Sequence, residues 1–111
     1  MKKKRSIKEI NHLFPKIKEY LKKVYGNKLE AIIIYGSFAN NKANEDSDID
    51  IAIILKEKIN PAKEVCRVVD FISDLGLEHD ELITVLPLSL QEVENSIWPL
   101  YRSLREKGIR L

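Results

Sequence analysis

The residues best suited to chemistry lie between positions 36 and 50. Gly36 and Ser37 directly follow an apolar run, and a glycine beside a small hydroxyl residue lets backbone N–H groups and an O–H reach a phosphate. Asp48 and Asp50, with one residue between them, begin the next apolar run. On a strand this spacing places both carboxylates on one face, where they can share a metal ion. A phosphate cradle with paired carboxylates predicts metal-assisted chemistry on a nucleotide.

Length and composition restrict the function classes. The 111 residues allow one domain, residues 1–111, and 44% apolar with 32% charged residues is typical of a soluble globular protein. No apolar run approaches the roughly 20 residues of a membrane span. The basic N-terminus continues with Lys8 and Glu9 instead of the apolar block of a secretory signal, so we expect a cytoplasmic protein with a solvated basic tail. The net charge of +2, from scattered Lys and Arg, does not indicate nucleic acid as a partner.

Helical periodicity predicts the N-terminal element. Apolar residues recur every three or four positions over residues 7–24, behind a capping-box pattern of Ser6 and Glu9. Proline lacks the N–H that an interior helical residue donates, so Pro15 predicts a kink or two consecutive helices. Gly26 is expected to end the region.

Further helices are predicted in the second half of the chain. Asn60-Pro61 is typical of a helix start, and the apolar stripe that follows is expected to end at Gly76. Cys66 falls within this pattern, so we expect it to be a buried small hydrophobic residue; as the only cysteine it cannot form an internal disulfide. The C-terminal signals are a capping box at Ser89 and Glu92, an interruption at Trp98-Pro99, an end at Gly108, and a tail, residues 109–111, over the core.

Three short strands are predicted. Residues 29–35 form a β-branched apolar run expected in mid-sheet with both faces covered, and residues 37–40 are expected to begin a short helix. Residues 48–55 form the second strand, whose short connection to the first predicts antiparallel pairing. Residues 81–88 form the third, in which Pro87 predicts an edge or a bulge. This order predicts an α+β fold: a small mixed β-sheet packed with helices, mostly on one face.

The motif from Gly36 to Asp50 resembles the signature of the minimal nucleotidyltransferases, small antitoxin-like members of the DNA polymerase beta-like superfamily. Their signature is Gly-Ser, a spacer of about the length of residues 38–47, and Asp-x-Asp on a strand. Ala39 and Ser47 also match, and the C-terminal Trp98-Pro99-Leu100-Tyr101 looks like the family ending. The resemblance covers most of the chain and implies the nucleotidyltransferase fold.

The resemblance also implies a reaction and the residues that perform it. A nucleoside monophosphate, AMP from ATP, would be transferred to an acceptor hydroxyl with release of pyrophosphate. Gly36, Ser37 and nearby backbone amides would bind the triphosphate. Asp48 and Asp50 would be catalytic and would hold Mg²⁺, which prefers carboxylate and phosphate oxygens. A HEPN-type helical toxin, modified by this chain as antitoxin, is the implied protein partner.

The chain departs from the family pattern in three respects. Asn40-Asn41 stands where the family commonly has Arg-Gly, which removes a cation near the phosphates. The third carboxylate of the superfamily, which helps to bind metal or activate the acceptor, aligns near Thr84. Glu81 or Asp80 is the substitute left open, although a strand advances about 3.3 Å per residue and the displacement amounts to roughly 10 Å. No separate base-recognition domain follows, so a partner or a shallow pocket is expected to choose the acceptor and the base.

Other interpretations use the same residues. A catalytically weak nucleotide- or partner-binding module and a purely structural interaction subunit both stay open, as do the acceptor, the preferred base and a homo-oligomer. An EF-hand loop beginning at Asp46 is disfavoured because Ile51 occupies the position that requires glycine. His12 and His79 lie far apart in the sequence and lack metal-ligand spacing.

Overall fold

The computed structural model describes residues 2–111, which form four α-helices and four strands. The elements in chain order are the 3-10 helices η1 (Ile7–Glu9) and η2 (Asn11–Leu13), α1 (Phe14–Tyr25), η3 (Gly26–Lys28), β1 (Leu29–Tyr35), β2 (Ile49–Leu55), α2 (Pro61–Glu78), β3 (Ile83–Ser89), α3 (Leu90–Asn95), α4 (Pro99–Lys107) and β4 (Ile109–Arg110). All three predicted strands are present, and the predicted C-terminal tail contributes a short fourth one.

The strands form one mixed sheet in the order β3-β2-β1-β4. β1 pairs antiparallel with β2, as their short connection predicts, and also antiparallel with β4. β3 runs parallel to β2, because the chain crosses back through α2 before it re-enters the sheet. β1 therefore lies in mid-sheet and β3 at an edge. An edge strand tolerates Pro87, which has no N–H to donate to a neighbouring strand.

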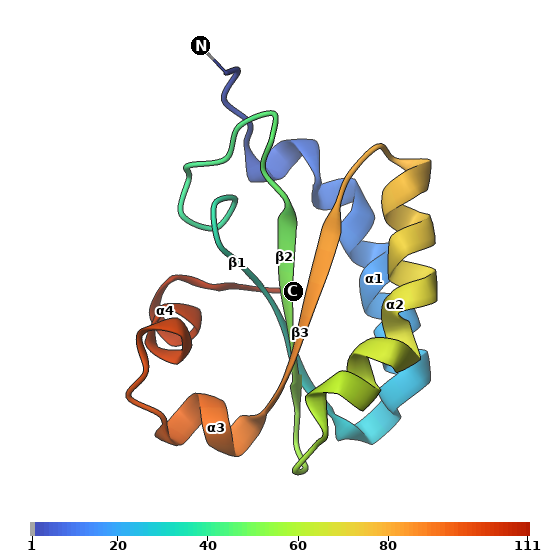
Figure 1. Cartoon of the computed structure of the whole chain (residues 1–111), viewed down its shortest axis with the longest axis vertical. Helices are drawn as coiled ribbons and strands as arrows, with labels where there is room; N and C mark the ends of the chain where they lie inside the picture. Colours follow the sequence, from blue (N-terminus) through green and yellow to red (C-terminus); the bar gives the residue numbers. More distant parts are fainter. Residues whose placement is uncertain (1) are drawn as a thin grey trace.

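Helices cover both faces of this sheet, which corrects the prediction that they lie mostly on one. Figure 1 shows α1 and α2 on one side of the strands and α3 and α4 on the other. The physical reason lies in β2, which buries Ile51 and Ile53 on one face and Ala52 and Ile54 on the other. A strand that is apolar on both faces requires a layer of helices over each.

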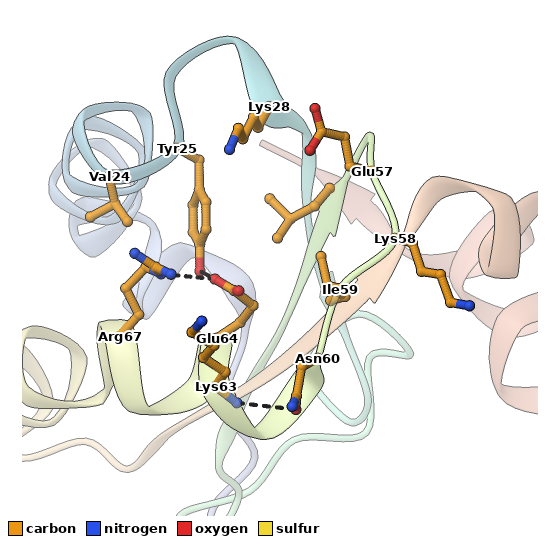
Figure 2. A pocket seen from close by; sticks show the side chains of 11 residues that line it. Val24, Tyr25, Lys28, Glu57, Lys58, Ile59, Asn60, Lys63, Glu64 and Arg67 are labelled. Carbon is orange, nitrogen blue, oxygen red and sulfur yellow. Dashed lines mark hydrogen bonds and ion pairs between the residues drawn. The ribbon is translucent and has the colours of Figure 1, made fainter.

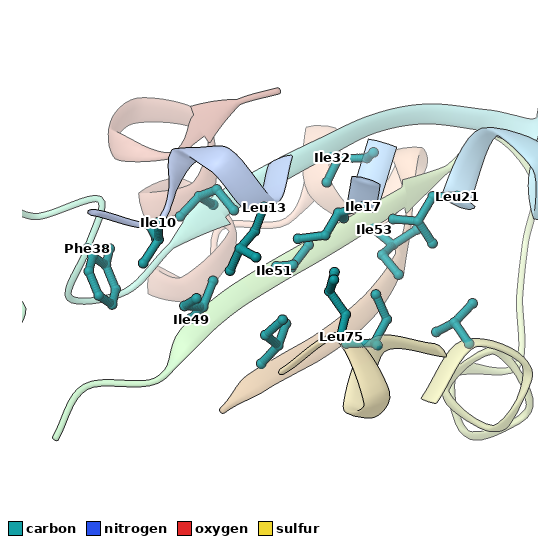
Figure 3. Packing of buried hydrophobic residues seen from close by; sticks show 14 of the residues in the cluster. Ile10, Leu13, Ile17, Leu21, Ile32, Phe38, Ile49, Ile51, Ile53 and Leu75 are labelled. Carbon is teal, nitrogen blue, oxygen red and sulfur yellow. The ribbon is translucent and has the colours of Figure 1, made fainter. Parts of the chain in front are cut away.

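The larger core cluster determines which way β2 faces. Figure 3 shows Ile49, Ile51 and Ile53 packed with residues of the N-terminal helices and with Leu75 of α2. All three isoleucines are fully buried. A slip by one residue would turn them to the opposite face and carry Asp50 into the core. Burial of these side chains, at about 1.5–3 kcal/mol each, therefore orients the acidic motif as well.

Two helix predictions, one end and one short helix, are wrong for local reasons. α2 continues past Gly76 to Glu78. Gly76 instead allows the chain before β3 to approach the helix closely, because a Cβ there would lie 2.5 Å from the Glu81 carbonyl oxygen. Residues 37–40 form a turn instead of a short helix. The Asn40 N–H donates to the Gly36 carbonyl at 3.0 Å, and the positive φ of 58° at Asn41 ends the helical path.

The helix starts agree better with prediction. The Ser6 N–H donates to the Glu9 carboxylate at 2.7 Å, as the capping box predicts. Pro15 lies in the first turn of α1, where its missing N–H leaves no bond unmade, and the 3-10 helices precede it. Of the two alternatives left open, consecutive helices are therefore the one observed.

The prediction that Cys66 is buried is wrong, because its side chain is exposed. The buried stripe of α2 consists of Val68, Ile72 and Leu75, and Val69 is 37% exposed. The apolar residues of α2 form a wider stripe than the one that is buried, because a helix packed on a sheet buries only a narrow strip of its surface.

The basic N-terminal segment is not a solvated tail, which corrects another prediction. Lys4 forms a β-bridge with Asn44, and the Arg5 N–H donates to the Ala43 carbonyl at 3.0 Å. The Arg5 side chain is 18% exposed and binds Glu81. Within residues 2–111, none of the helices combines the length and apolarity that crossing a bilayer requires.

Candidate functional site

Gly36 ends β1 in a conformation and a space that only glycine fits. Its φ is +76°, which side chains disfavour, and a Cβ at this position would lie 2.3 Å from Oδ2 of Asp50. The structure thus brings the first and last residues of the motif into direct contact. The Asp50 carboxylate fits against the backbone of residue 36 because that residue has no side chain.

Asp50 occupies the centre of a polar row across three strands. It pairs with Tyr35 of β1 on one side and with Thr84 of β3 on the other. The Thr84 hydroxyl donates to Oδ1 of Asp50 at 2.7 Å. Thr84, near which the resemblance implies a third carboxylate, therefore contacts Asp50, and its neutral hydroxyl orients Asp50 without adding negative charge.

A tight turn precedes Asp48. The Asn44 N–H donates to the Ser47 hydroxyl at 2.9 Å, and the Asn44 side chain accepts from the Asp46 N–H at 2.8 Å. Asp48 follows directly, one residue before β2, and is half-buried like Asp50. Residues i and i+2 of an extended segment point to the same side, so we expect both carboxylates on one side of the strand.

Ser37 lies in the turn that leaves β1. Its carbonyl accepts the Lys42 N–H at 2.9 Å, and the Gly36 carbonyl accepts the Asn40 N–H at 3.0 Å. These bonds hold residues 37–42 compactly beside the sheet, with Ser37 half-buried and adjacent to Gly36. The structure thus gathers Gly36, Asp50 and Thr84 by direct contact, with Ser37 and Asp48 next to them in the chain.

Glu81, the other position considered for the third carboxylate, has a different partner. It precedes β3, and both of its carboxylate oxygens accept from Arg5, at 2.8 and 2.6 Å. Asp80 is exposed and adopts a positive φ of 55° in the connection before it. Arg5 neutralises Glu81 locally, so Thr84 is the candidate that contacts Asp50.

Tyr35 belongs to the site, although sequence reasoning did not single it out. Burial raises the pKa of Tyr35, and the negative charge of Asp50 raises it further, while a hydrogen bond with Thr84 acts in the opposite direction. Its position directly before Gly36 was the available signal. The pairing with Asp50 could not be inferred because it depends on the register between β1 and β2.

The donor set suits a hard divalent cation. Asp48 and Asp50 offer carboxylate oxygens, the ligands that Mg²⁺ prefers, and a Cβ at position 36 would displace the Asp50 carboxylate. Within residues 2–111 no group of three or more His, Cys, Asp or Glu side chains is arranged around a metal position. His12 and His79 do meet in space, with ring centroids 5.4 Å apart and an edge-on arrangement.

A separate cavity opens at the other end of the sheet. It has a volume of about 310 Å³ and is lined by residues that include Tyr25, Leu55, Lys63 and Glu64 (Figure 2). Leu55 is five residues beyond Asp50 on β2, or roughly 17 Å along a strand. Neither aspartate of the motif lines this cavity, so it is distinct from the candidate site.

Known structures share this fold. The chain is similar to the toxin-antitoxin MntA-HpeT, crystallised as a doubly substituted variant, with a TM-score of 0.59 and 18% identity over 86% of this chain and 69% of that one. A crystal structure of a toxin-antitoxin with AMP-PNP also matches with a TM-score of 0.59, at 19% identity and the same coverage. At these identities the likeness establishes the fold alone.

Sequence relatives extend the likeness over nearly their whole length. One protein of Methanocaldococcus jannaschii, provisionally named a protein adenylyltransferase, is 30% identical over 78% of this chain and 94% of its own. A second one of that organism, with the same provisional name, is 36% identical over 84% of this chain and 92% of its own.

A family model places these similarities in one group. The model described as "Polymerase beta, Nucleotidyltransferase" matches residues 15–107, which include β1, β2, β3 and every residue of the acidic motif. The predicted nucleotidyltransferase class and fold are confirmed. The chain belongs to the polymerase beta nucleotidyltransferase family.

Proposed function

We propose that this chain transfers AMP from ATP to a hydroxyl group of an acceptor protein and releases pyrophosphate. In this reaction a bond forms between the acceptor oxygen and the α-phosphorus, while the bond from that phosphorus to the oxygen leading to the β-phosphate breaks. The hydroxyl proton is released to water. The relatives named for protein adenylylation and the neighbour crystallised with AMP-PNP, an ATP analogue, support this choice of nucleotide and acceptor.

The observation that carries the proposal is the contact between Gly36 and the Asp50 carboxylate. It brings the Gly-Ser turn against one of the paired acids, so the backbone of this turn and a carboxylate lie side by side. Backbone amides beside carboxylates suit a triphosphate together with its counter-ion. A side-chain nucleophile is not required, because positioning and charge neutralisation account for most of the catalysis of phosphoryl transfer.

Asp48 and Asp50 would hold Mg²⁺, with Gly36 and Ser37 against the phosphates. The bound cation would neutralise charge on the phosphate oxygens during the displacement. Thr84 keeps the Asp50 carboxylate in one orientation through its 2.7 Å hydrogen bond. The MntA-HpeT neighbour was crystallised with two aspartates, separated by one residue, changed to glutamates, which is the same spacing as in this pair.

The acceptor we propose is a HEPN-type helical toxin partner, with this chain as the antitoxin. Two neighbours of the fold are toxin-antitoxin structures, which supports a protein acceptor of this kind. We also propose that residues 1–111 act as one minimal nucleotidyltransferase domain, so that the partner contributes to the choice of acceptor hydroxyl.

The test of this function is transfer of label from α-labelled ATP to the partner protein in the presence of Mg²⁺. We expect Asp48→Ala and Asp50→Ala to abolish transfer, because each removes oxygen donors from a site that has two carboxylates. Asp74→Ala is the matched control, since Asp74 is exposed on α2, outside the motif. Transfer that persists in either test variant would sink the assignment.

Thr84 favours a second candidate, a nucleotide- or partner-binding module with weak catalysis. The residue in register with Asp50 is neutral, so the row has one carboxylate fewer than the resemblance implies. This candidate predicts that ATP with Mg²⁺ raises the melting temperature while no pyrophosphate is released with any acceptor. A chain that shows neither a shift nor transfer would instead be a structural interaction subunit.

A further inference from the structure

Arg5 connects two segments that border the candidate site from different parts of the chain. Its guanidinium donates to both carboxylate oxygens of Glu81, at 2.8 and 2.6 Å, across 76 residues of sequence. The same guanidinium lies over the ring of Phe38, 5.4 Å from its centroid. Glu81 precedes β3, which carries Thr84, and Phe38 directly follows Ser37.

The pair is shielded from water. The Arg5 and Glu81 side chains are 18% and 9% exposed, and Phe38 is 4% exposed as part of the larger core. The hydrogen bonds to Glu81 raise the pKa of Arg5 above its ordinary value. A forked, two-bond contact in such surroundings fixes geometry in a way that an exposed ion pair does not.

The same segment also holds the loop between β1 and β2, through two backbone hydrogen bonds and one ion pair. Residues 2–5, here called the N-terminal clamp, bind it at three points. The Arg5 N–H donates to the Ala43 carbonyl at 3.0 Å, and the Glu45 N–H donates to the Lys3 carbonyl at 3.1 Å. Lys2 forms an ion pair with Asp46. These contacts lie within the segment that separates Ser37 from Asp48.

We propose that Arg5 is a positioning residue of the nucleotidyl-transfer site. Through Phe38 it holds the turn that presents Ser37, and through Glu81 it holds the start of the strand that presents Thr84 to Asp50. The phosphate-binding and metal-binding groups are thereby held at a fixed distance from each other. The assignment rests on the proposed function, because positioning has meaning only for a site that binds a triphosphate.

A positioning role for Arg5 predicts an effect on ATP binding that a general contribution to stability does not. Loss of the fork should loosen residues 37–42 relative to β2, so ATP should bind less productively while the fold persists. We expect Arg5→Ala to raise KM for ATP and to reduce transfer at low ATP by about 10- to 100-fold, because a displacement of about 1 Å can cost this much. Arg5→Lys, which keeps the charge without the fork, should recover only part of the loss.

The variants have matched controls. Val68→Ala removes volume from the core on α2 away from the site and serves to match the loss in melting temperature. Arg102→Ala breaks an exposed pair with Glu106 on α4, 3.1 Å long, and should change nothing. The exchanged pair, Arg5→Glu with Glu81→Arg, should restore KM in part if the contact itself matters.

A second measurement does not depend on catalysis. The amides of Asn40 and Lys42 bond within the turn, so their hydrogen exchange reports its order. In Arg5→Ala they should exchange faster than the change in global stability explains, and in Val68→Ala they should not. If Arg5→Ala does not fold, Glu81→Gln and Arg5→Lys give the same comparison in milder form.

The outcomes separate the two proposals. If exchange and KM change no more in the Arg5 variants than in Val68→Ala at equal melting temperature, Arg5 is merely structural and the inference fails. If Asp48→Ala keeps transfer, the proposed function fails, and the exchange measurement still decides whether Arg5 holds the turn.

Discussion

Gly36 shows how one residue links local conformation to the candidate chemistry. Its positive φ of 76° turns the chain away from β1, and its missing side chain leaves room for the Asp50 carboxylate. Gly26 also has a positive φ, of 55°, but a Cβ there would meet nothing within 4 Å. A side chain at Gly26 would therefore cost backbone strain alone, whereas a side chain at Gly36 would also clash with its surroundings.

We predict that Gly36→Ala destabilises the protein more than Gly26→Ala and removes ATP binding. Gly26→Ala should cost about 1–3 kcal/mol from backbone strain alone, because its φ of 55° and ψ of −127° lie in a region that side chains rarely adopt. Gly36→Ala adds a contact of 2.3 Å with Oδ2 of Asp50, which must displace a carboxylate of the site. Urea unfolding measures the first difference, and the melting-temperature shift with ATP and Mg²⁺ measures the second. Equal costs for the two variants, with the ATP shift retained, would contradict this account.

At the scale of elements, α2 packs closely against the chain that leads into β3, the strand that carries Thr84. The last turn of α2 approaches the chain before β3 so closely that the Glu81 N–H donates to the Gly76 carbonyl at 2.8 Å. Gly76 is buried inside the helix, where glycine is otherwise unfavourable. Close packing of the two elements outweighs helix propensity at this position.

We predict that Gly76→Ala destabilises the protein although alanine is the better helix former. Propensity alone would stabilise α2 by about 1 kcal/mol. The new Cβ, however, would lie 2.5 Å from the Glu81 carbonyl oxygen, a backbone atom that cannot move without β3. Ser73→Ala, on the exposed side of the same helix, is the control and should be neutral or slightly stabilising. Thermal unfolding of both variants decides the sign, and a stabilised Gly76→Ala would refute the packing argument.

At the scale of the whole molecule, one tyrosine is buried on one face of the sheet and another is half-buried on the other. Tyr25 of α1 is 8% exposed and donates its hydroxyl to Glu64 of α2 at 3.0 Å, which joins the two helices of one layer. Burial raises the pKa of Tyr25, and the hydrogen bond to Glu64 raises it further. Tyr35 on the other face also has a raised pKa, first because of burial.

Alkaline pH should therefore destabilise the fold. The folded state holds these phenolic protons more tightly than the unfolded chain, whose tyrosines titrate near pH 10. The stabilisation is fully present below that pH and is lost as the pH rises through and above it. We expect Tyr25→Phe to lose the Glu64 hydrogen bond, about 1 kcal/mol at pH 7, and to flatten the decline in urea midpoint above about pH 10. A decline as steep as that of the unsubstituted chain would rule out Tyr25 as its source.

The sequence by itself determined the parts of the site that lie close together along the chain. Gly36, Ser37, Asp48 and Asp50 were identifiable because turn chemistry, strand alternation and the spacing between them are local properties. The same applies to the antiparallel pairing of β1 with β2. Local signals also placed most helix starts, such as Ser6 and Asn60, whose capping partners lie three residues away.

Only the tertiary structure decided what the motif contacts. Thr84 meets Asp50 across 34 residues and Arg5 meets Glu81 across 76, and neither pairing leaves a pattern in the neighbouring sequence. The exposure of Cys66 and the second layer of helices had the same origin, since burial depends on which surface the sheet offers. Register and packing are collective properties. Only one alignment of β2 buries its isoleucines, and this alignment brings the polar side chains of three strands into one row.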